Sequence, residues 1–599
     1  MANFVIIVDQ DAKRRAGFVE AITPLLPPVE GLITSSCASG AFHAAWAAHA
    51  SAPISRVADA EGAAVIWGDA IPGKGLGRID ARRLRKLWRD PAGHMPEALD
   101  GYHAGVVYRP DCLVVGADIT GMFPIHYFSA GNVLLVGSSP ELFRKHPLFR
   151  AELDPEGLVG ILLLMHSVGG KTMLRGVQRL AGGHLLCWRI GHRIRELEQY
   201  DLPCSDRYFD LPFSAHVDIA DQAFDESITR HVLDGSRHAM LLSGGLDSRV
   251  LGGFLKRQGR KDITLLSLGQ PSDVEMRCAV PVARELGFQH QMADPSFAEY
   301  PAFASLHAKW QHGINGFNHI MQWADHRVLR TLAPRVVTGH NGNPSLGGLR
   351  VSPPHSPTEP WVSFEKTFQS ANAWGLRRDV LQRLLRPDVF GDLVDETIRR
   401  IRADYESHGE RESHRALRFE FFNRARFHVG INAWALSFGA WPVLPYIDRN
   451  LLECMTGIPL ACFSERRLQE QLLATRFPEL ATLPLDRNIT DTFPLQPRFR
   501  WLVAWRLFLG PIHTLRQRLH RGEQRYYYRI YDINNPGWAA VRRQAEPYRD
   551  RVAQLFNIDA LSELLPPPGV PVKLENGLQD ASGRKTLLGL LLWAGDYLS

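Results

Sequence analysis

The chain has 599 residues, of which 45% are hydrophobic and 22% are charged, and its formal net charge is +6. This length predicts roughly two to four domains, and the composition is that of an ordinary globular protein. So small a basic excess gives no reason to expect a nucleic-acid partner, and seven scattered cysteines without a CxxC pair indicate neither a disulfide framework nor a zinc site.

No stretch reaches the roughly 18 apolar residues of a membrane span. The apolar run at residues 4–8 is too short for the core of a signal peptide and is followed by Asp9. We therefore expect a cytoplasmic protein without a transmembrane segment.

Short apolar runs separated by turns dominate the first two hundred residues. They predict stacked antiparallel sheets with a helix at residues 81–90. The predicted strands lie at residues 3–9, 63–69, 105–109, 112–118, 124–128 and 132–139.

From about Tyr208 the pattern changes to strands that alternate with longer helical periods. This alternation predicts a parallel sheet flanked by helices, with ligands at the carboxyl ends of its strands. The predicted strands lie at residues 239–242, 263–268, 289–294 and 335–339, with helices beginning at Arg249, Val274 and Phe317.

The most informative stretch follows the first of these strands. After Leu242 come Ser243, Gly244, Gly245, Leu246, Asp247 and Ser248. Glycines let backbone N–H groups approach an anion, and the following helix directs its positive end to the same place. A carboxylate beside a phosphate requires a cation between them, so Asp247 predicts bound Mg²⁺. The loop lacks the GxxxxGK[ST] pattern of P-loop ATPases.

This SGGLDS segment resembles the pyrophosphate-binding loop of the ATP pyrophosphatases, and most of all that of asparagine synthetase and its relatives. Residues 116–128, with Asp118, and the segment around Glu141 resemble the glutaminase domain of the same family. The resemblance implies an α/β protein that uses ATP and Mg²⁺ and activates a carboxylate as its acyl-adenylate. It implies a degenerate Ntn-type β-sandwich (glutamine-amidotransferase-like) at residues 1–205, and a parallel-sheet, adenine nucleotide alpha hydrolase-like synthetase domain with a helical C-terminal part at residues 206–599.

The resemblance adds the end of the predicted strand at residues 263–268, and the helix that follows it, to the expected site. Ser267, Leu268 and Gly269 would lie against adenine and ribose. Glu275 would be a catalytic residue, although an acid in a first helical turn equally suits a simple complement to the helix dipole.

The loop at residues 335–348 aligns with the family's SGEGSDEVFGG, so Gly339 and Gly342 would contact the nucleotide. Asn343 and Pro344 replace the family's acidic pair. Asn343 could still offer Mg²⁺ an uncharged oxygen, which leaves Asp247 as the main protein ligand.

The family's RxK loop corresponds to residues 479–495. Arg487 is present, but Asn488 or Ile489 stands where the family has the lysine that steadies the acyl-adenylate. The positive charge that steadies the acyl-adenylate would then come from Arg487 itself, or from Lys573 or Lys585.

The second residue is Ala2, where the family's glutaminase has a catalytic cysteine, and Cys37 is more simply a structural residue than a replacement. The resemblance then extends to the β-lactam synthetases and lasso-peptide macrolactam synthetases, in which the amine belongs to the substrate. The first specific expectation is closure of a lasso ring, with a precursor peptide and a leader-processing protease as partners.

Two alternatives remain open. One is an amide synthetase or amidotransferase of another secondary-metabolite or polysaccharide pathway; the other is a non-catalytic scaffold, suggested by Asn343 and the missing lysine. The arginine-rich, aromatic segment at residues 498–529 suits either a solvated helix or a docking face for a peptide, a partner enzyme or an anionic membrane.

Overall fold

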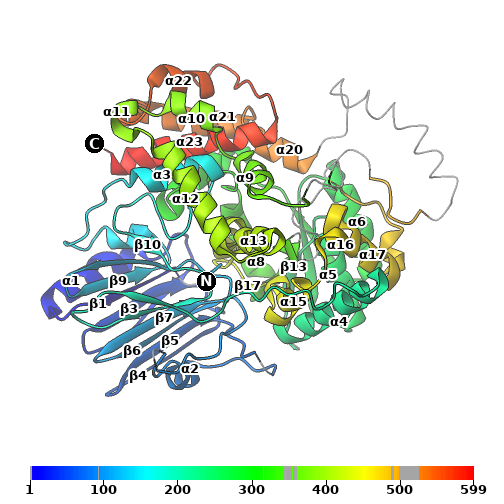
Figure 1. Ribbon diagram of the computed structural model, residues 1–599, viewed down its shortest axis with the longest axis horizontal. Coiled ribbons are helices and arrows are strands. Elements are labelled where there is room, and N and C mark those ends of the chain that lie inside the picture. The colour runs from blue at the N-terminus through cyan, green and yellow to red at the C-terminus, as the bar shows by residue number, and fades with distance from the viewer. Residues whose placement is uncertain are drawn as a thin grey trace.

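Figure 1 shows the computed structural model of the protein. It describes residues 3–73, 75–91, 93–233, 235–314, 316–342, 344–345, 354, 360–487, 492–497 and 525–598. Asn343, Asn488 and Ile489, and all but Arg525–Arg529 of the arginine-rich segment, lie outside the described residues.

The first two hundred residues form two six-stranded antiparallel sheets, as the sequence predicts (Figure 1). The strand orders are β10-β8-β9-β1-β3-β2 and β12-β11-β7-β6-β5-β4. The strands are β1 Asn3–Val8, β2 Ile33–Ser39, β3 Phe42–Ala48, β4 Ile54–Asp59, β5 Gly62–Gly68, β6 His103–Arg109, β7 Cys112–Ala117, β8 His126–Ala130, β9 Val133–Gly137, β10 Gln178–Arg179, β11 His184–Trp188 and β12 Arg195–Glu198.

Large aromatic side chains join the two sheets. Phe4 of β1 stacks on Trp67 of β5 with 4.3 Å between ring centroids, and Trp46 of β3 meets the same ring edge-on at 5.7 Å. The helices α1 (Ala12–Ile22) and α2 (Ala81–Leu87) complete this part of the molecule. Strand β1 is buried throughout because it lies inside its sheet, whereas the edge strand β2 is mostly polar and exposed.

The second half contains a five-stranded parallel sheet of order β15-β14-β13-β16-β17. Its strands are β13 His238–Leu241, β14 Ile263–Leu268, β15 Gln289–Ala293, β16 Arg335–Val337 and β17 Trp441–Val443. The sequence predicts the first four. Strand β17 has no counterpart among the predicted strands, because its three residues lie within a long apolar stretch without a clear period. Pro442 is tolerated there because the strand lies at the edge of the sheet.

Helices surround this sheet (Figure 1). Two begin away from their predicted positions: α5 starts at Leu246, before Arg249, and α8 starts at Gln322, after Phe317. The helices are α4 Phe213–His231, α5 Leu246–Arg257, α6 Val274–Leu286, α7 Tyr300–Gln311, α8 Gln322–Leu332, α14 Gly430–Leu436, α15 Arg449–Met455, α16 Leu460–Phe463, α17 Arg467–Arg476 and α18 Pro478–Ala481.

A further group of helices packs beside both sheet-containing parts, and α3, from the first 205 residues, contacts α12 and α23 within it (Figure 1). Immediately before α14 the chain forms a ten-residue π-helix, η5. The members are α3 Pro155–Leu164, α9 Phe364–Asn372, α10 Arg378–Leu384, α11 Pro387–Phe390, α12 Leu393–Ser407, α13 Glu412–Phe419, η5 Glu420–Val429, α20 Tyr526–Tyr531, α21 Pro536–Ala545, α22 Ile558–Leu564 and α23 Leu578–Tyr597.

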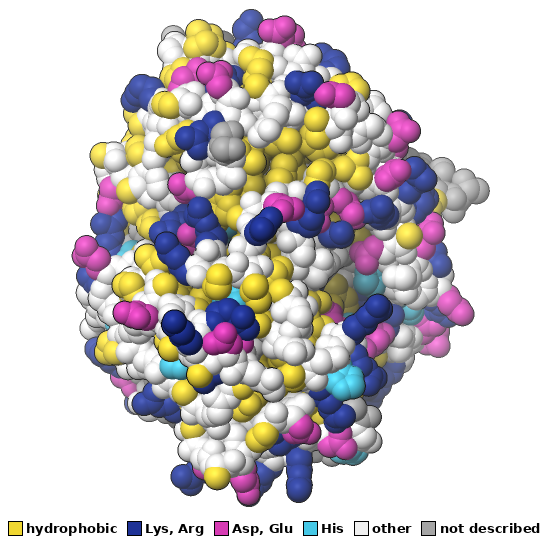
Figure 2. Space-filling view, turned by 90° about the vertical axis from the view of Figure 1, so that its left-hand side faces the viewer, with side chains coloured by type: hydrophobic (Ala, Val, Ile, Leu, Met, Phe, Trp, Pro, Cys, Tyr) yellow, Lys and Arg dark blue, Asp and Glu magenta, His cyan; other side chains and the backbone are white. Residues whose placement is uncertain are grey.

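The surface is of mixed charge on the face shown in Figure 2, where basic and acidic side chains are interspersed. Apolar side chains gather in the upper half of that view. Among the described helices, none combines the length and the apolar character needed to cross a bilayer.

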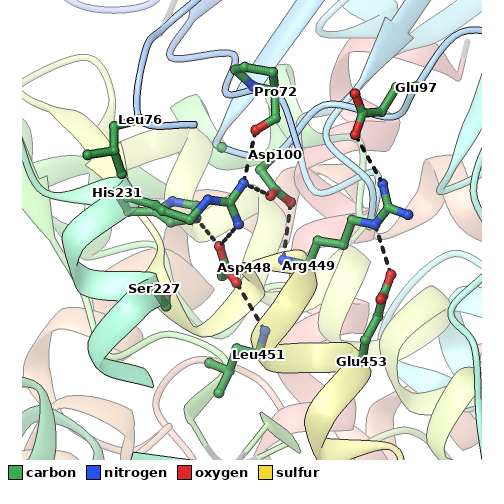
Figure 3. A network of polar contacts seen from close by, with 12 residues as sticks. Pro72, Leu76, Glu97, Asp100, Ser227, His231, Asp448, Arg449, Leu451 and Glu453 are labelled. Carbon is green, nitrogen blue, oxygen red and sulfur yellow. Dashed lines mark hydrogen bonds and ion pairs between the residues drawn. The ribbon is translucent and has the colours of Figure 1, made fainter. Parts of the chain in front are cut away.

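Buried ion pairs join the β-sandwich to the half of the chain that contains the parallel sheet (Figure 3). Arg230, at the end of α4, lies 2.5 Å from carboxylate oxygens of both Asp100 and Asp448. Asp448 also accepts a hydrogen bond from the backbone N–H of Leu451 at 3.0 Å and so caps α15, while His231 lies 3.1 Å from its other oxygen. Asp448 therefore has a structural role at this interface.

Candidate active site at the carboxyl ends of the strands

The loop after β13, residues 243–248, is the candidate phosphate cradle. Gly244 has φ +76°, and a β-carbon there would lie 2.7 Å from Cβ of Cys278, so only glycine fits. Gly245 precedes α5 without any side-chain cap, which leaves the first N–H groups of the helix available to a ligand. Free N–H groups and the positive end of the helix dipole together suit a phosphate.

The two serines of the loop differ in exposure. Ser248 is buried, and its hydroxyl accepts a hydrogen bond from the backbone N–H of Ser243 at 3.2 Å. Ser243 is exposed, and its own hydroxyl lies 3.2 Å from that of Ser248. Ser248 thus stabilises the conformation of the loop, while the exposed Ser243 is accessible to a ligand.

Asp247 is held by residues from three distant elements. Gln469 Nε2 donates to Asp247 Oδ1 at 2.7 Å, Arg466 Nη1 lies 3.7 Å from the same oxygen, and Tyr446 donates its hydroxyl to the backbone carbonyl of Asp247 at 2.9 Å. Sequence reasoning missed Gln469 and Arg466, because they lie more than two hundred residues away and carry no local signal. The side chain of Asp247 remains 27% exposed and so is accessible to a ligand.

The loop after β16 packs directly on this cradle. A β-carbon at Gly342 would lie 2.7 Å from Cβ, Cγ and Oδ1 of Asp247, and one at Gly339 would lie 3.3 Å from Asp247 Cβ and from the backbone nitrogen of Ser248. The two glycines therefore allow two strand-end loops to meet around Asp247.

The loop after β14 is in contact with the cradle on one side and with the start of α20 on the other. Ser267 donates its hydroxyl to the carbonyl of Leu242 at 2.7 Å and lies 2.8 Å from His290 Nε2, so it ties β14 to the cradle. Leu268 is half-buried. Gly269 has φ +133°, and a β-carbon there would lie 3.2 Å from the ring of Tyr526. The start of α20 therefore lies against the position expected for adenine.

Glu275 anchors that same helix. Its two carboxylate oxygens accept hydrogen bonds from the backbone N–H groups of Tyr526 and Tyr527, at 2.9 and 3.2 Å. Arg525 lies 3.5 Å from Oε1, and Glu275 is 9% exposed. In this arrangement the carboxylate holds α20 against α6.

Arginines connect the cradle to the segment that contains Arg487. Arg249 is fully buried and donates to the carbonyls of Leu480 at 2.8 Å, Leu483 at 3.1 Å and Gly244 at 3.0 Å. Burial, and then the nearby charge of Arg487, lower the pKa of Arg249 to about 10. Arg487 itself donates to the carbonyl of Phe493. Arg487 thus lies close to the cradle.

The two lysines considered as alternatives differ in their surroundings. Lys573 is exposed. Lys585 is 1% exposed, its ammonium donates to the carbonyl of Tyr531 at 2.5 Å, and burial lowers its pKa to about 7. The ammonium group of Lys585 is therefore buried against α20, where it binds a backbone carbonyl.

The donor set fits Mg²⁺ only in company with phosphate. Among the described residues, no three His, Cys, Asp or Glu side chains are grouped so as to hold a metal ion. Mg²⁺ is commonly bound by one or two carboxylates together with substrate phosphates, and an accessible Asp247 beside a phosphate cradle meets that requirement.

Comparison with known proteins agrees with this geometry. Residues 220–474 match the family model described as asparagine synthase, a segment that includes the whole parallel sheet. Asparagine synthetase [glutamine-hydrolyzing] 3 of Bacillus subtilis (strain 168) is 25% identical over 185 residues, which cover 28% of this chain and 28% of that protein.

Solved structures with some likeness include the NH3-dependent NAD synthetase of Campylobacter jejuni, with a TM-score of 0.17 and 14% identity over 23% of this chain and 61% of that one. The NMN synthetase of Francisella tularensis has a TM-score of 0.20 and 18% identity over 37% of this chain and 96% of that one.

Proposed function

We propose that this protein adenylates a carboxylate with ATP, releases pyrophosphate, and joins the activated carboxyl group to an amine. The observation that carries the proposal is the loop at Ser243–Ser248, where no side chain caps the start of α5 and Gly342 packs directly against Asp247. The match of residues 220–474 to the asparagine synthase family supports it.

The proposed chemistry proceeds in two steps. A carboxylate oxygen attacks the α-phosphorus of ATP, the bond between the α-phosphorus and its bridging oxygen breaks, and the electron pair leaves with pyrophosphate. The amine then attacks the acyl carbon, AMP leaves, and the amine proton passes to solvent. Catalysis comes chiefly from positioning and from stabilising the charge that develops on pyrophosphate.

The residues of the loop have distinct roles in this proposal. The exposed Ser243 hydroxyl and the first N–H groups of α5 bind phosphate oxygens. Asp247 would hold Mg²⁺, which supplies positive charge next to the phosphates. Gly339 and Gly342 let the loop after β16 pack closely enough against Asp247 to fix the orientation of its side chain.

We further propose that the amine belongs to the substrate, and that the reaction closes the macrolactam ring of a lasso peptide. Burial raises the pKa of all seven cysteines, so none has the low thiol pKa of an activated nucleophile. Cys37, the candidate nearest the N-terminus in sequence, is 7% exposed, with its sulfur 3.9 Å from the carbonyl of Val57. This supports an amine that does not come from cysteine-dependent glutamine hydrolysis.

The test is pyrophosphate release by the full chain with Mg·ATP and candidate peptides, followed by mass spectrometry. Ring closure lowers the mass of the peptide by one water, whereas coupling to a free amine adds the mass of that amine less one water. Asp247→Asn should abolish release, while Asp225→Asn, at an exposed ion pair with Arg257, should leave it unchanged. Equal release by Asp247→Asn and the wild type would refute the proposed site.

A further inference from the structure

The backbone is strained at the point where α17 begins. Glu465 and Arg466 have φ values of +53° and +64°, so two consecutive non-glycine residues adopt the left-handed conformation. Such residues persist only where their surroundings fix them, and they concentrate at functional sites. This turn places the side chain of Arg466 beside Asp247.

The contact between Arg466 and Asp247 is poorly suited to a purely structural role. Nη1 of Arg466 is 3.7 Å from Asp247 Oδ1, and the two side chains are 33% and 27% exposed. Ion pairs of this kind contribute little to stability. By contrast, the buried Arg249 places its donors on backbone carbonyls, and Arg525 contacts both Asp486 and Glu275. Among the described residues, Arg466 is the partly exposed cation that pairs with Asp247, the carboxylate that the phosphates would approach.

From this geometry we propose that Arg466 is a catalytic residue that binds the β- and γ-phosphates of ATP and neutralises the departing pyrophosphate. The inference rests on the proposed function, since it needs ATP in the cradle. When Asp247 engages Mg²⁺, its oxygen no longer pairs with Arg466, and the guanidinium is then free to pair with phosphate oxygens. A planar guanidinium binds two phosphate oxygens at once, and it is always charged.

This assignment answers a question that the sequence leaves open. The resemblance expects a lysine after Arg487, where this chain has uncharged residues, and Lys585 is buried beside Tyr531. Arg466 comes from a different element and brings a positive charge to within 3.7 Å of Asp247 Oδ1. As the bond to the bridging oxygen breaks, the electron pair moves onto pyrophosphate, and a fixed cation there favours the transition state.

The test is isothermal titration of the full chain with two probes, inorganic pyrophosphate with Mg²⁺ and AMP. Arg466→Gln should weaken pyrophosphate binding at least tenfold and leave AMP binding unchanged, because AMP lacks the β- and γ-phosphates. Arg466→Lys should recover part of the loss. Arg467→Gln is the matched control: its side chain stacks on Phe213 at 4.2 Å, and it should bind both probes like the wild type.

The outcomes separate the two proposals. If the wild type binds neither pyrophosphate nor AMP, the proposed function fails, and the role of Arg466 with it. If the wild type binds both but Arg466→Gln binds pyrophosphate equally well, the role of Arg466 alone is refuted. An equal loss of AMP and pyrophosphate binding would show general damage to the loop, and would also refute the specific role.

Discussion

Gly342 lies against the carboxylate of Asp247, although the two residues are separated by almost a hundred positions in the chain. A β-carbon at position 342 would come within 2.7 Å of three atoms of the Asp247 side chain. Gly342→Ala should therefore move Asp247 rather than unfold the protein. A displacement of about 1 Å in a reacting group can cost roughly a hundredfold in rate, and we expect a loss of pyrophosphate release of that order.

The control for this prediction is Gly17→Ala, because a β-carbon at Gly17 would meet no atom within 4 Å. It should leave the rate unchanged. Thermal unfolding of both variants should show a small cost for Gly342→Ala, about 1–3 kcal/mol, as for other substitutions that overpack a site. Wild-type activity in Gly342→Ala would mean that the contact does not orient Asp247.

Arg230 makes a second testable contact, between the two halves of the molecule (Figure 3). Arg230→Met would leave the buried carboxylates of Asp100 and Asp448 without their shared cation. Removing one partner of a buried pair costs about 3–5 kcal/mol, which should be visible in urea unfolding at pH 7. Arg327→Met, which breaks an exposed pair with Glu299, should cost less than about 1 kcal/mol.

Burial, and then repulsion by Asp448, raise the pKa of Asp100 to about 6. The penalty of Arg230→Met should therefore shrink as the pH falls toward 6, because protonation removes one of the unpaired charges. A penalty that is independent of pH would mean that Asp100 does not carry the uncompensated charge.

The sequence could predict what local patterns encode. The strands around Leu241 and Leu266 are apolar runs of the right length, and the glycines that follow mark the phosphate cradle before any contact is known. Strand β17 could not be predicted, since three residues within an apolar stretch have no distinguishing period.

The contacts around the site depend on long-range folding. Arg466 and Gln469 reach Asp247 from beyond two hundred residues, and no spacing in the sequence connects them. From the sequence alone, Glu275 was compatible with a complement to the helix dipole or with a site role. Which one applies depends on which backbone N–H groups the fold brings to its carboxylate.

A group of buried and half-buried histidines makes the stability of the protein depend on pH. Burial lowers the pKa of His166 and His340 to about 4 and that of His319 to about 3, from 6.5. Between pH 6.5 and 4 the unfolded chain binds protons that the native protein does not. Stability is therefore fully present above pH 6.5 and is lost as the pH falls, by up to about 1.4 kcal/mol per pH unit for each such histidine.

His319→Asn isolates one member of this cluster. His319 lies 2.6 Å from the hydroxyl of Tyr531 and 3.0 Å from His428 Nε2, so the variant also loses contacts and should be less stable at every pH. Its unfolding free energy should nevertheless fall less steeply below pH 6.5 than that of the wild type. His94→Asn, at an exposed position, should not change the slope of the unfolding free energy against pH. If His319→Asn also leaves that slope unchanged, His319 is not neutral in the native protein.

The role of Glu275 can be decided by comparing stability with chemistry. Its carboxylate accepts two backbone N–H groups at the start of α20, so Glu275→Gln, which retains one acceptor oxygen, should act as a weakened cap. Losing such a cap costs about 0.5–2 kcal/mol, and a lower melting temperature should result. Pyrophosphate release at saturating ATP should fall less than tenfold, far less than in Asp247→Asn. Glu285→Gln, at an exposed pair with Lys256, controls for the change of charge. If Glu275→Gln melts like the wild type but releases no pyrophosphate, the carboxylate takes part in the reaction, and α20 must move away from it when substrate binds.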